Sequence, residues 1–274
     1  MDSPVSFGVV ADLQYCDADP EINRYFRNAP KKLSYAIDEL NKHDLDFIIN
    51  LGDTIDHNWE SFDGILPVFN QSNVPVYHVL GNHDYEIEDV YKAHVPAKIG
   101  TERHYDFSLN GWRFIVLDGN EISTFAHPES SEGYLKGKAL LIALEDQGAV
   151  NANFWNGGIG QEQLKWLESC LSNADKNNEK VIIFCHFPVY PEHRHNLLND
   201  REVLNLIVNH DCFKLWINGH NHDGNYGMYH DKHFVNLKGM ADTEFDLAFS
   251  ILQLYDDHVI IKGFGSEISA RLNF

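Results

Sequence analysis

Polar motifs follow the ends of apolar segments throughout this chain. Five apolar segments have the composition and length of β-strands: Phe7–Ala11, Phe47–Leu51, Val76–Leu80, Val181–Cys185 and Phe213–Ile217. In addition, Lys31–His43 and Gln161–Ala174 carry apolar residues at the spacing of amphipathic helices. Alternating strands and helices predict an α/β fold, and in such folds ligands bind at the carboxyl ends of the strands.

Seven side chains in these motifs carry atoms that can bind a divalent metal. They are Asp12, Gln14, Asp53, Asn82, His186, His220 and His222. If the strands end at one edge of the fold, their oxygen and imidazole nitrogen atoms converge on one point. A carboxylate such as that of Asp53 can place one oxygen on each of two cations. The pattern therefore predicts a site for two divalent metals.

No single motif establishes this site. A Gly-Asp pair such as Gly52-Asp53 is a common turn, and a lone strand histidine such as His186 is often a buried residue bonded to the backbone. The His-x-His motif of His220 and His222 is the strongest signal, yet it binds metal in only a minority of proteins. The ordered occurrence of five motifs at consistent strand ends makes coincidence a poor explanation.

Together the motifs resemble those of the calcineurin-like metallophosphoesterases, which run Asp-x-His, Gly-Asp, Gly-Asn-His-Asp/Glu, a lone His and Gly-His-x-His. Gln14 stands where most members have histidine. The resulting Asp-x-Gln motif and the segments Asn156–Leu164, His186–Pro191 and Gly219–Gly224 are similar to those of the manganese-dependent ADP-ribose/CDP-alcohol diphosphatases. The resemblance extends from the first strand to Arg271, but the loops after Thr54 and Gly119 are short, which leaves the substrate preference open.

The resemblance implies both an architecture and a set of metal ligands. The fold would be a four-layer α/β metallophosphoesterase fold, a two-sheet β-sandwich flanked by α-helices. One metal would be bound by Asp12, Gln14, Asp53 and His222, and the second by Asp53, Asn82, His186 and His220. Both metals are then expected at the edge of the sandwich.

The resemblance also implies a reaction. A hydroxide bridging the two metals would attack phosphorus and cleave the phosphoanhydride bond of ADP-ribose or a CDP-alcohol. His83, oriented by Asp84, is expected to stabilise the transition state or protonate the leaving oxygen. Two other functions remain open: a cyclic-nucleotide or glycerophosphodiester phosphodiesterase, and a non-catalytic scaffold. Retention of every candidate ligand and of His83 disfavours the scaffold.

Gln14 bears on the identity of the two divalent metals. An amide oxygen is a harder and weaker donor than an imidazole nitrogen, so this substitution favours manganese or magnesium over zinc or iron. We therefore expect Mn²⁺, with Mg²⁺, Fe and Zn²⁺ as alternatives.

Substrate-binding candidates are arginines and aromatic residues near the motifs. Arginines for phosphate are Arg24, Arg27 and Arg194, and aromatic residues for the base or ribose are Tyr15, Phe154, Trp155 and Phe187. The alternative for each is that it has no role in substrate binding, because exposed arginines are usually solvated and aromatic residues usually belong to the core.

The charge balance limits the partners. The net charge is −20 and is spread along the chain, which argues against nucleic acid or an anionic membrane. A small nucleotide diphosphate is the expected partner, since bound metals can reverse the local potential, and no protein partner is inferred. With no signal-peptide pattern, no long apolar run and four widely separated cysteines, a reduced, cytoplasmic protein is expected.

One domain spanning residues 1–274 is predicted, because no segment has the composition of a linker. Gly119–Gly160 differs from the rest, with several glycines and a predicted helix at Lys136–Gln147. This segment, residues 119–160, is a candidate cap insert over the metal site. A β-hairpin is predicted around Asn110-Gly111.

Overall fold

The computed structural model describes residues 4–274, so the first three residues of the predicted domain lie outside the described residues. Its strands form two six-stranded sheets. In spatial order the first sheet contains β12 (Ala270–Asn273), β11 (His258–Gly265), β10 (Ala248–Leu254), β1 (Val5–Val10), β2 (Phe47–Asn50) and β3 (Val76–His78). The second contains β4 (Tyr105–Leu109), β5 (Trp112–Val116), β6 (Lys180–Phe184), β7 (Phe213–Asn218), β9 (Lys232–Asn236) and β8 (Asn225–Tyr229).

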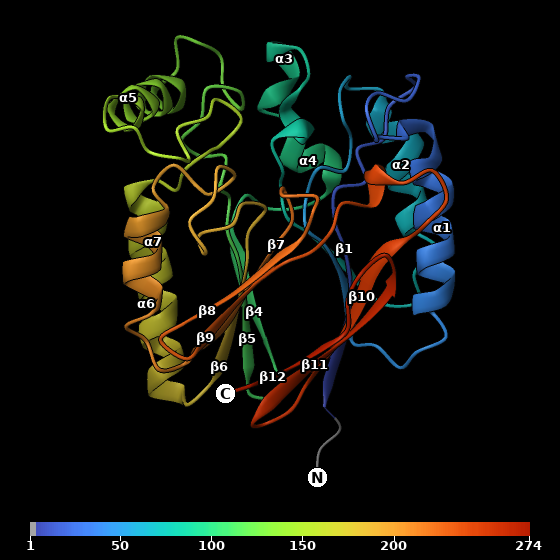
Figure 1. The fold of residues 1–274 in the computed structure, drawn as a ribbon, viewed down its shortest axis with the longest axis vertical. Coiled ribbons are helices and arrows are strands. Elements are labelled where there is room, and N and C mark those ends of the chain that lie inside the picture. Colours follow the sequence, from blue (N-terminus) through green and yellow to red (C-terminus); the bar gives the residue numbers. More distant parts are fainter. Residues whose placement is uncertain (1–3) are drawn as a thin grey trace.

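The two sheets face each other, and helices cover their outer faces (Figure 1). On the first sheet lie α1 (Ala29–Leu40) and α2 (Ser61–Phe69), and on the second lie α6 (Gln161–Asn177) and α7 (Asp200–Ile207). Three apolar clusters correspond to these contacts, one between the sheets and one under each helical layer. This is the four-layer sandwich that the resemblance implied.

Alternation along the strands explains how one chain fills three apolar layers. On β1, Phe7 and Val9 enter the cluster between the sheets, whereas Val10 enters the cluster under α1. Phe7 stacks on Phe47 of β2 with ring centroids 4.7 Å apart. Because successive side chains of a strand point to opposite faces, a strand buried on both sides is apolar at nearly every position.

The strands that precede the motifs are parallel to one another within each sheet. In the first sheet β1 pairs with β2 and β2 with β3, and in the second β6 pairs with β7, all in parallel. Their carboxyl ends therefore lie at the same end of the molecule, the upper end in Figure 1. The edge strands β12, β4 and β8 are antiparallel to their neighbours, whereas the edge strand β3 is parallel to β2. The pair β4–β5 is the predicted hairpin, in which Leu109 pairs with Trp112 across Asn110 and Gly111, both at positive φ.

The predicted element boundaries differ from the observed ones by a few residues. The first predicted helix lies at Ala29–Leu40 instead of Lys31–His43, and α6 continues past Ala174 to Asn177. Four predicted strands continue one or two residues too far, since Ala11, Leu51, Leu80 and Cys185 already follow the strands. The fifth, Phe213–Ile217, ends one residue before β7 does. The four residues that follow the strands are still buried, so apolar character alone does not show where the hydrogen-bonded strand ends.

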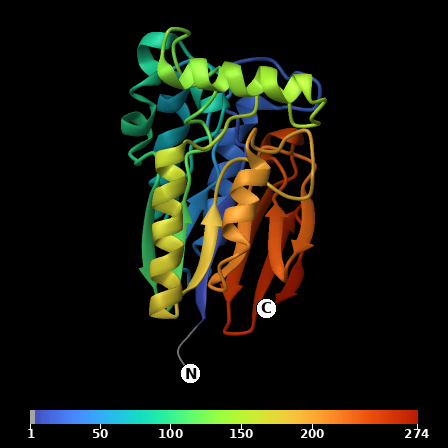
Figure 2. The same ribbon diagram turned by 90° about the vertical axis from the view of Figure 1, so that its left-hand side faces the viewer.

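The segment of residues 119–160 lies above the ends of the strands. Its helix α5 (Glu132–Asp146) crosses the top of the molecule above α6 and α7 (Figure 2). Gly137 is its one buried residue, and a Cβ there would meet the backbone of Ser123 at 2.7 Å. Two short helices, α3 (Asp89–Lys92) and α4 (Val95–Ile99), follow β3. Whether residues 119–160 act as a cap stays a prediction. Within residues 4–274, none of the helices combines the length and apolar character needed to cross a membrane.

Candidate metal centre

Two groups of side chains meet at the carboxyl ends of the parallel strands. Ligand atoms of Asp53, His186 and His220 lie within 4.8 Å of one another, and so do those of Asp12, Asp53 and His222. Asp53 belongs to both groups. The fold thus brings five of the seven predicted ligands into two sets that share one carboxylate.

Gln14 and Asn82, the two amide ligands, complete the sets. Asn82 Oδ1 lies 3.1 Å from His186 Nε2, and Gln14 Nε2 lies 3.2 Å from Asp53 Oδ2. Gln14 Oε1 is buried and has no hydrogen-bond partner in the part of the chain that the structure describes. A buried amide oxygen without a partner is unfavourable unless a ligand satisfies it, so Gln14 fits a cation site.

Each histidine of these sets has one ring nitrogen beside a hydrogen-bond acceptor that is not one of the seven predicted ligands. The pairs are His186 Nδ1 with the Leu51 carbonyl at 2.8 Å, His222 Nδ1 with Asp242 at 2.5 Å, and His220 Nε2 with Asn156 at 3.0 Å. When the nitrogen beside that outside acceptor carries the proton of a neutral imidazole, the other nitrogen keeps its lone pair for a metal. In His186 this other nitrogen, Nε2, lies among the predicted ligands, 3.1 Å from Asn82 Oδ1 and 3.2 Å from Asp53 Oδ2. Metal-binding histidines have this arrangement. The residues present therefore fit two divalent metals.

Several ligands occupy unusual backbone conformations. Asp12, Gln14, Asp53 and His220 have φ values of 51°, 46°, 52° and 67°. Such left-handed conformations are unfavourable for residues other than glycine, and they cluster where structure is held for function. A close backbone approach accompanies them, because a Cβ at Gly81 would lie 2.1 Å from Asp53 Oδ1. Glycine before the Asn-His pair therefore allows this loop to reach the shared carboxylate.

Buried acids and bases neutralise one another in this centre. Burial raises the pKa of Asp12, partly opposed by His222 and His186. Burial also acts to raise the pKa of Asp53, but His186 and His83 lower it below its ordinary value. For His186, burial acts to lower the pKa, and the carboxylates of Asp53 and Asp12 raise it to about 9. Metal binding would replace the protons of these groups, since metal ligands must be deprotonated.

Asp84 does not orient His83, contrary to the prediction. Its buried carboxylate accepts hydrogen bonds from the backbone N–H groups of Gly81, Asp53 and Thr54 at 2.9, 3.2 and 2.8 Å. It therefore ties the loop after β3 to the loop after β2. His83 and Asp84 lie in one 3₁₀ turn, where adjacent side chains point in different directions, which explains why proximity in sequence misled.

Asp56 is the carboxylate that contacts His83, and sequence analysis missed it. Its Oδ1 lies 3.2 Å from His83 Nδ1, and its Oδ2 lies 2.6 Å from His57 Nδ1. Burial acts to lower the pKa of His83, but Asp53 and Asp56 raise it to about 9. The available signal was a second acid three residues after Asp53, in Asp53-Thr54-Ile55-Asp56.

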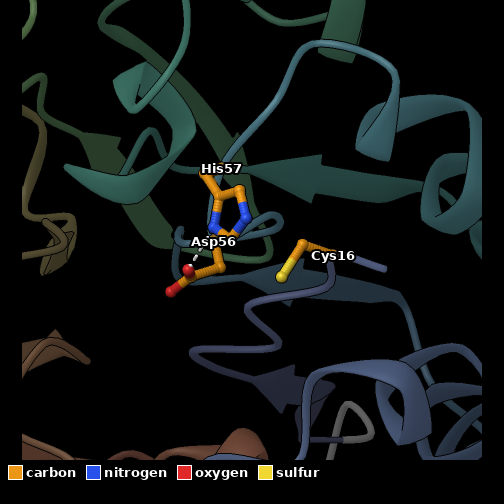
Figure 3. A group of neighbouring side chains, drawn as sticks. All are labelled: Cys16, Asp56 and His57. Atoms are coloured by element: carbon orange, nitrogen blue, oxygen red, sulfur yellow. Dashed lines mark hydrogen bonds and ion pairs between the residues drawn. The ribbon is translucent and has the colours of Figure 1, made fainter. Parts of the chain in front are cut away.

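Asp56 also lies beside His57 and the buried Cys16, as Figure 3 shows. Burial raises the pKa of the Cys16 thiol to about 12. Within residues 4–274, Asp56 contacts both His57 and His83, whereas the buried Cys16 thiol makes no side-chain hydrogen bond to these residues.

A cavity of about 300 Å³ opens above the two sets of ligands. It is lined by Gln14, Arg24, Asp53, Asn82, His83, Glu86, Phe154, Trp155, Arg194, His195, His220 and His222. We call the seven ligands the metal floor, and we call Phe154, Trp155, Arg194 and His195 the aromatic wall. Arg24, Phe154, Trp155 and Arg194 were candidates from the sequence, whereas Glu86 and His195 were missed because nothing in their local sequence marks them.

Three substrate-binding candidates lie outside this cavity, which corrects the prediction. Arg27 is on the surface, where it pairs with Asp17 and Asp19 at 2.5 Å each. Tyr15 packs on α2, where a Cβ at Gly64 would meet its ring. Phe187 has no exposed surface, and its ring lies 4.6 Å from that of His220, so it supports the metal floor from beneath.

The chain belongs to the calcineurin-like phosphoesterase family, whose model matches residues 5–224, a span that includes the whole metal floor. It is a metal-dependent hydrolase with a two-metal centre, as the sequence predicted.

Individual relatives narrow this class. The chain is 31% identical to the manganese-dependent ADP-ribose/CDP-alcohol diphosphatase of Homo sapiens, with 98% of this chain and 92% of the relative aligned. It is also 31% identical to the Arabidopsis thaliana protein of the same name, over 94% and 93% of the two chains. A solved dimetal phosphatase from Danio rerio is similar over all of both chains, with a TM-score of 0.89 and 25% identity.

Proposed function

We propose that this protein hydrolyses the phosphoanhydride bond of nucleoside diphosphate derivatives such as ADP-ribose and CDP-alcohols. The observation that carries the proposal is the combination of two ligand sets sharing Asp53 with a cavity flanked by Arg24 and Arg194. The relatives from Homo sapiens and Arabidopsis thaliana, whose names state this activity, support the same substrate class.

The metal floor prepares the site for phosphoryl chemistry. Two divalent cations held by the seven residues of the metal floor would supply Lewis-acid chemistry, lowering the pKa of water and neutralising the phosphoryl oxygens. Asp53 belongs to both ligand sets, and a hydrogen bond from the His83 backbone N–H to its Oδ1, at 2.8 Å, fixes its carboxylate. Its position between both sets makes it the residue on which the whole centre depends.

His83 is the proposed acid of the reaction. It lines the cavity, and Asp56 holds its Nδ1, so its Nε2 is the ring nitrogen left to act on a ligand. There it stabilises the departing phosphate oxygen by a hydrogen bond or a proton, an effect commonly worth about 10²–10⁴ in rate. Asp84 acts only by fixing the two loops that carry Asp53 and His83.

The second phosphate and the nucleoside lie against the arginines and the aromatic wall in this proposal. Arg24 comes from the loop after β1 and Arg194 from the loop after β6, so cationic groups from two separate loops line the cavity. Phe154 and Trp155 offer flat faces on which a base can stack. The buried Trp155 N–H has no partner within residues 4–274, and a substrate oxygen would satisfy it.

Manganese is the proposed metal because Gln14 supplies an oxygen atom where an imidazole would favour zinc or iron. Chelation should remove the activity, and added Mn²⁺ should restore more of it than equal free Zn²⁺. Equal or better restoration by Zn²⁺ would contradict this part of the proposal.

A hydrolysis panel tests the substrate class. Purified protein with Mn²⁺ is given ADP-ribose, CDP-choline, cyclic AMP and bis(p-nitrophenyl) phosphate, and the products are identified by chromatography and mass spectrometry. The expected products are AMP with ribose 5-phosphate and CMP with phosphocholine. An Asp53→Asn preparation purified in parallel detects contaminating hydrolases. Faster cleavage of cyclic AMP or the diester would favour a phosphodiesterase instead.

A further inference from the structure

Asn156 is buried between the metal floor and the aromatic wall, with 1% of its surface exposed. It begins the Asn-Gly-Gly segment that sequence analysis noted only as part of a resemblance. Its Nδ2 lies 2.8 Å from the carbonyl of Arg194 and 3.0 Å from that of Asn151, and its Oδ1 lies 3.0 Å from His220 Nε2. One amide therefore contacts a metal ligand and the wall together.

The orientation of this amide follows from its partners. Carbonyl oxygens only accept hydrogen bonds, so the atom that faces Arg194 and Asn151 has to be the amino group. The oxygen then faces His220 Nε2, which has to carry the proton. In the neutral ring, His220 Nδ1 is left with the lone pair that a metal needs.

The same amide holds the loop that carries Arg194 and His195. Asn153 makes a related contact, since its Nδ2 lies 2.9 Å from the Arg194 carbonyl and 3.1 Å from that of Val150. Unlike Asn156, Asn153 has no hydrogen bond to His220. Asn153 and Asn156 lie on either side of Phe154 and Trp155 in the sequence. Their hydrogen bonds to the Arg194 carbonyl therefore join the segment of Phe154 and Trp155 to the segment of Arg194 and His195.

Glycine at position 157 brings Asn156 close enough to reach His220. A Cβ at Gly157 would lie 2.1 Å from the carbonyl oxygen of Gly119, so a larger residue would displace this segment. The Gly157 carbonyl also accepts a hydrogen bond from the Leu198 N–H at 2.8 Å. The segment is therefore pinned on both sides.

We propose that Asn156 is a positioning residue that couples metal binding to substrate binding. Its oxygen selects the His220 tautomer with Nδ1 free for the second metal, and its amino group holds the Arg194 loop in place. The effect on metal binding stands on the geometry alone, whereas the effect on substrate rests on the proposed function.

Three variants separate these two effects. Asn156→Leu removes both contacts, Asn156→Asp keeps an acceptor for His220 but loses the amino group, and Asn153→Ala weakens the Arg194 loop without touching His220. Mn²⁺ binding to each chelator-treated protein is measured by titration calorimetry. For Asn156→Leu we expect affinity at one of the two sites to fall about 10–100-fold, the usual effect of losing a partner of a ligating histidine. The other two variants should retain wild-type affinity.

A spectroscopic measurement distinguishes positioning from general structural damage. Long-range ¹H–¹⁵N spectra of the metal-free protein report the tautomer of each histidine. His220 should be protonated at Nε2 in the wild type, Asn156→Asp and Asn153→Ala, and should lose that preference in Asn156→Leu. Circular dichroism and thermal unfolding establish that each variant is folded. If Asn156→Leu does not fold, Asn156→Ser takes its place with the same expectations.

Kinetics complete the test. Asn156→Asp and Asn153→Ala should raise KM for the best substrate while kcat changes little, because the wall is loosened over an intact floor. Wild-type Mn²⁺ affinity together with an unchanged His220 tautomer in the folded Asn156→Leu or Asn156→Ser variant would overturn the proposal. If the wild type hydrolyses none of the panel substrates, the proposed function fails, and the titration and tautomer results still decide the role of Asn156.

Discussion

The metal floor and the aromatic wall are adjacent, yet they are held in opposite ways. Floor residues such as Asp12, Gln14 and His186 have no exposed surface, and backbone or side-chain groups from the loops after other strands fix them. In the wall, Phe154 is 66% exposed, and Trp155 and His195 each have a buried ring nitrogen without a partner in the described chain. Both regions keep polar atoms for a ligand that are unpaired within residues 4–274, Gln14 Oε1 in the floor and the two ring nitrogens in the wall, but only the wall also exposes a large aromatic side chain.

The comparison predicts that substitutions in the floor lower the rate of the chemical step, whereas substitutions in the wall lower the affinity for substrate.

The largest effect is expected for Asp53→Asn, because both ligand sets lose their shared carboxylate. Stoichiometric binding of two metals should be lost, and turnover should fall to background, beyond the roughly 10⁴-fold range of acid–base effects. Metal content by mass spectrometry and hydrolysis rates check this. Asp17→Asn, a surface carboxylate paired with Arg27, is the matched control and should behave as wild type. Two tightly bound metals in Asp53→Asn would refute the shared-ligand geometry.

The next effect concerns the His83–Asp56 pair at the rim of the floor. His83→Ala should lower kcat by about 10²–10⁴ while both metals remain bound. Asp56→Asn should lower it less, because His83 remains but its ring is held more loosely. Since the two act as one unit, the double variant should be no slower than His83→Ala alone. Fully additive losses would show that Asp56 does not act through His83, and near-wild-type turnover of His83→Ala with its metals in place would remove His83 from the reaction.

The floor could be predicted from the sequence because each ligand lies within a few residues of a strand end, and parallel strands end together. The partner of His83 could not, since Asp56 lies 27 positions away and the adjacent Asp84 offered a misleading alternative. For the wall and the arginines near it, the residue types suggested substrate binding, but the sequence did not show which side chains point into the cavity. Arg24 enters the cavity, while Arg27, three residues later, turns to surface carboxylates. Loop side chains lack the fixed periodicity that tells which face of a strand a residue occupies.

Acid should lower the stability of the folded protein through His78, which lies on β3 below the metal floor. Its Nδ1 lies 3.4 Å from Asn50 Nδ2 of β2. Burial lowers the pKa of His78 from 6.5 to about 4. The nearby charges of Asp63 and Lys98 pair with each other at 2.6 Å. Because the unfolded chain takes up this proton at higher pH than the folded one, His78 reduces stability as pH falls from 6.5 to 4, by roughly 3 kcal/mol in total.

Replacing His78 by phenylalanine removes this titration while retaining an aromatic ring beside Phe69. Urea unfolding of the metal-free wild type and His78→Phe at pH 7.5, 6, 5 and 4 measures the difference. The variant should lose less stability than the wild type between pH 6.5 and 4 and the same amount above pH 7. Parallel losses throughout the acid range would show that His78 does not couple proton uptake to unfolding.

The smallest effect is expected in the wall. Phe154→Ala should raise KM about tenfold with kcat nearly unchanged, because a stacked base contributes about 1–3 kcal/mol and the floor is untouched. Phe245→Ala is the matched control, since Phe245 is also exposed, at 79%, but does not line the cavity. Initial rates with ADP-ribose and CDP-choline measure both constants. A fall in kcat with unchanged KM for Phe154→Ala would mean that the wall takes part in the chemical step, and the division between a catalytic floor and a binding wall would then be wrong.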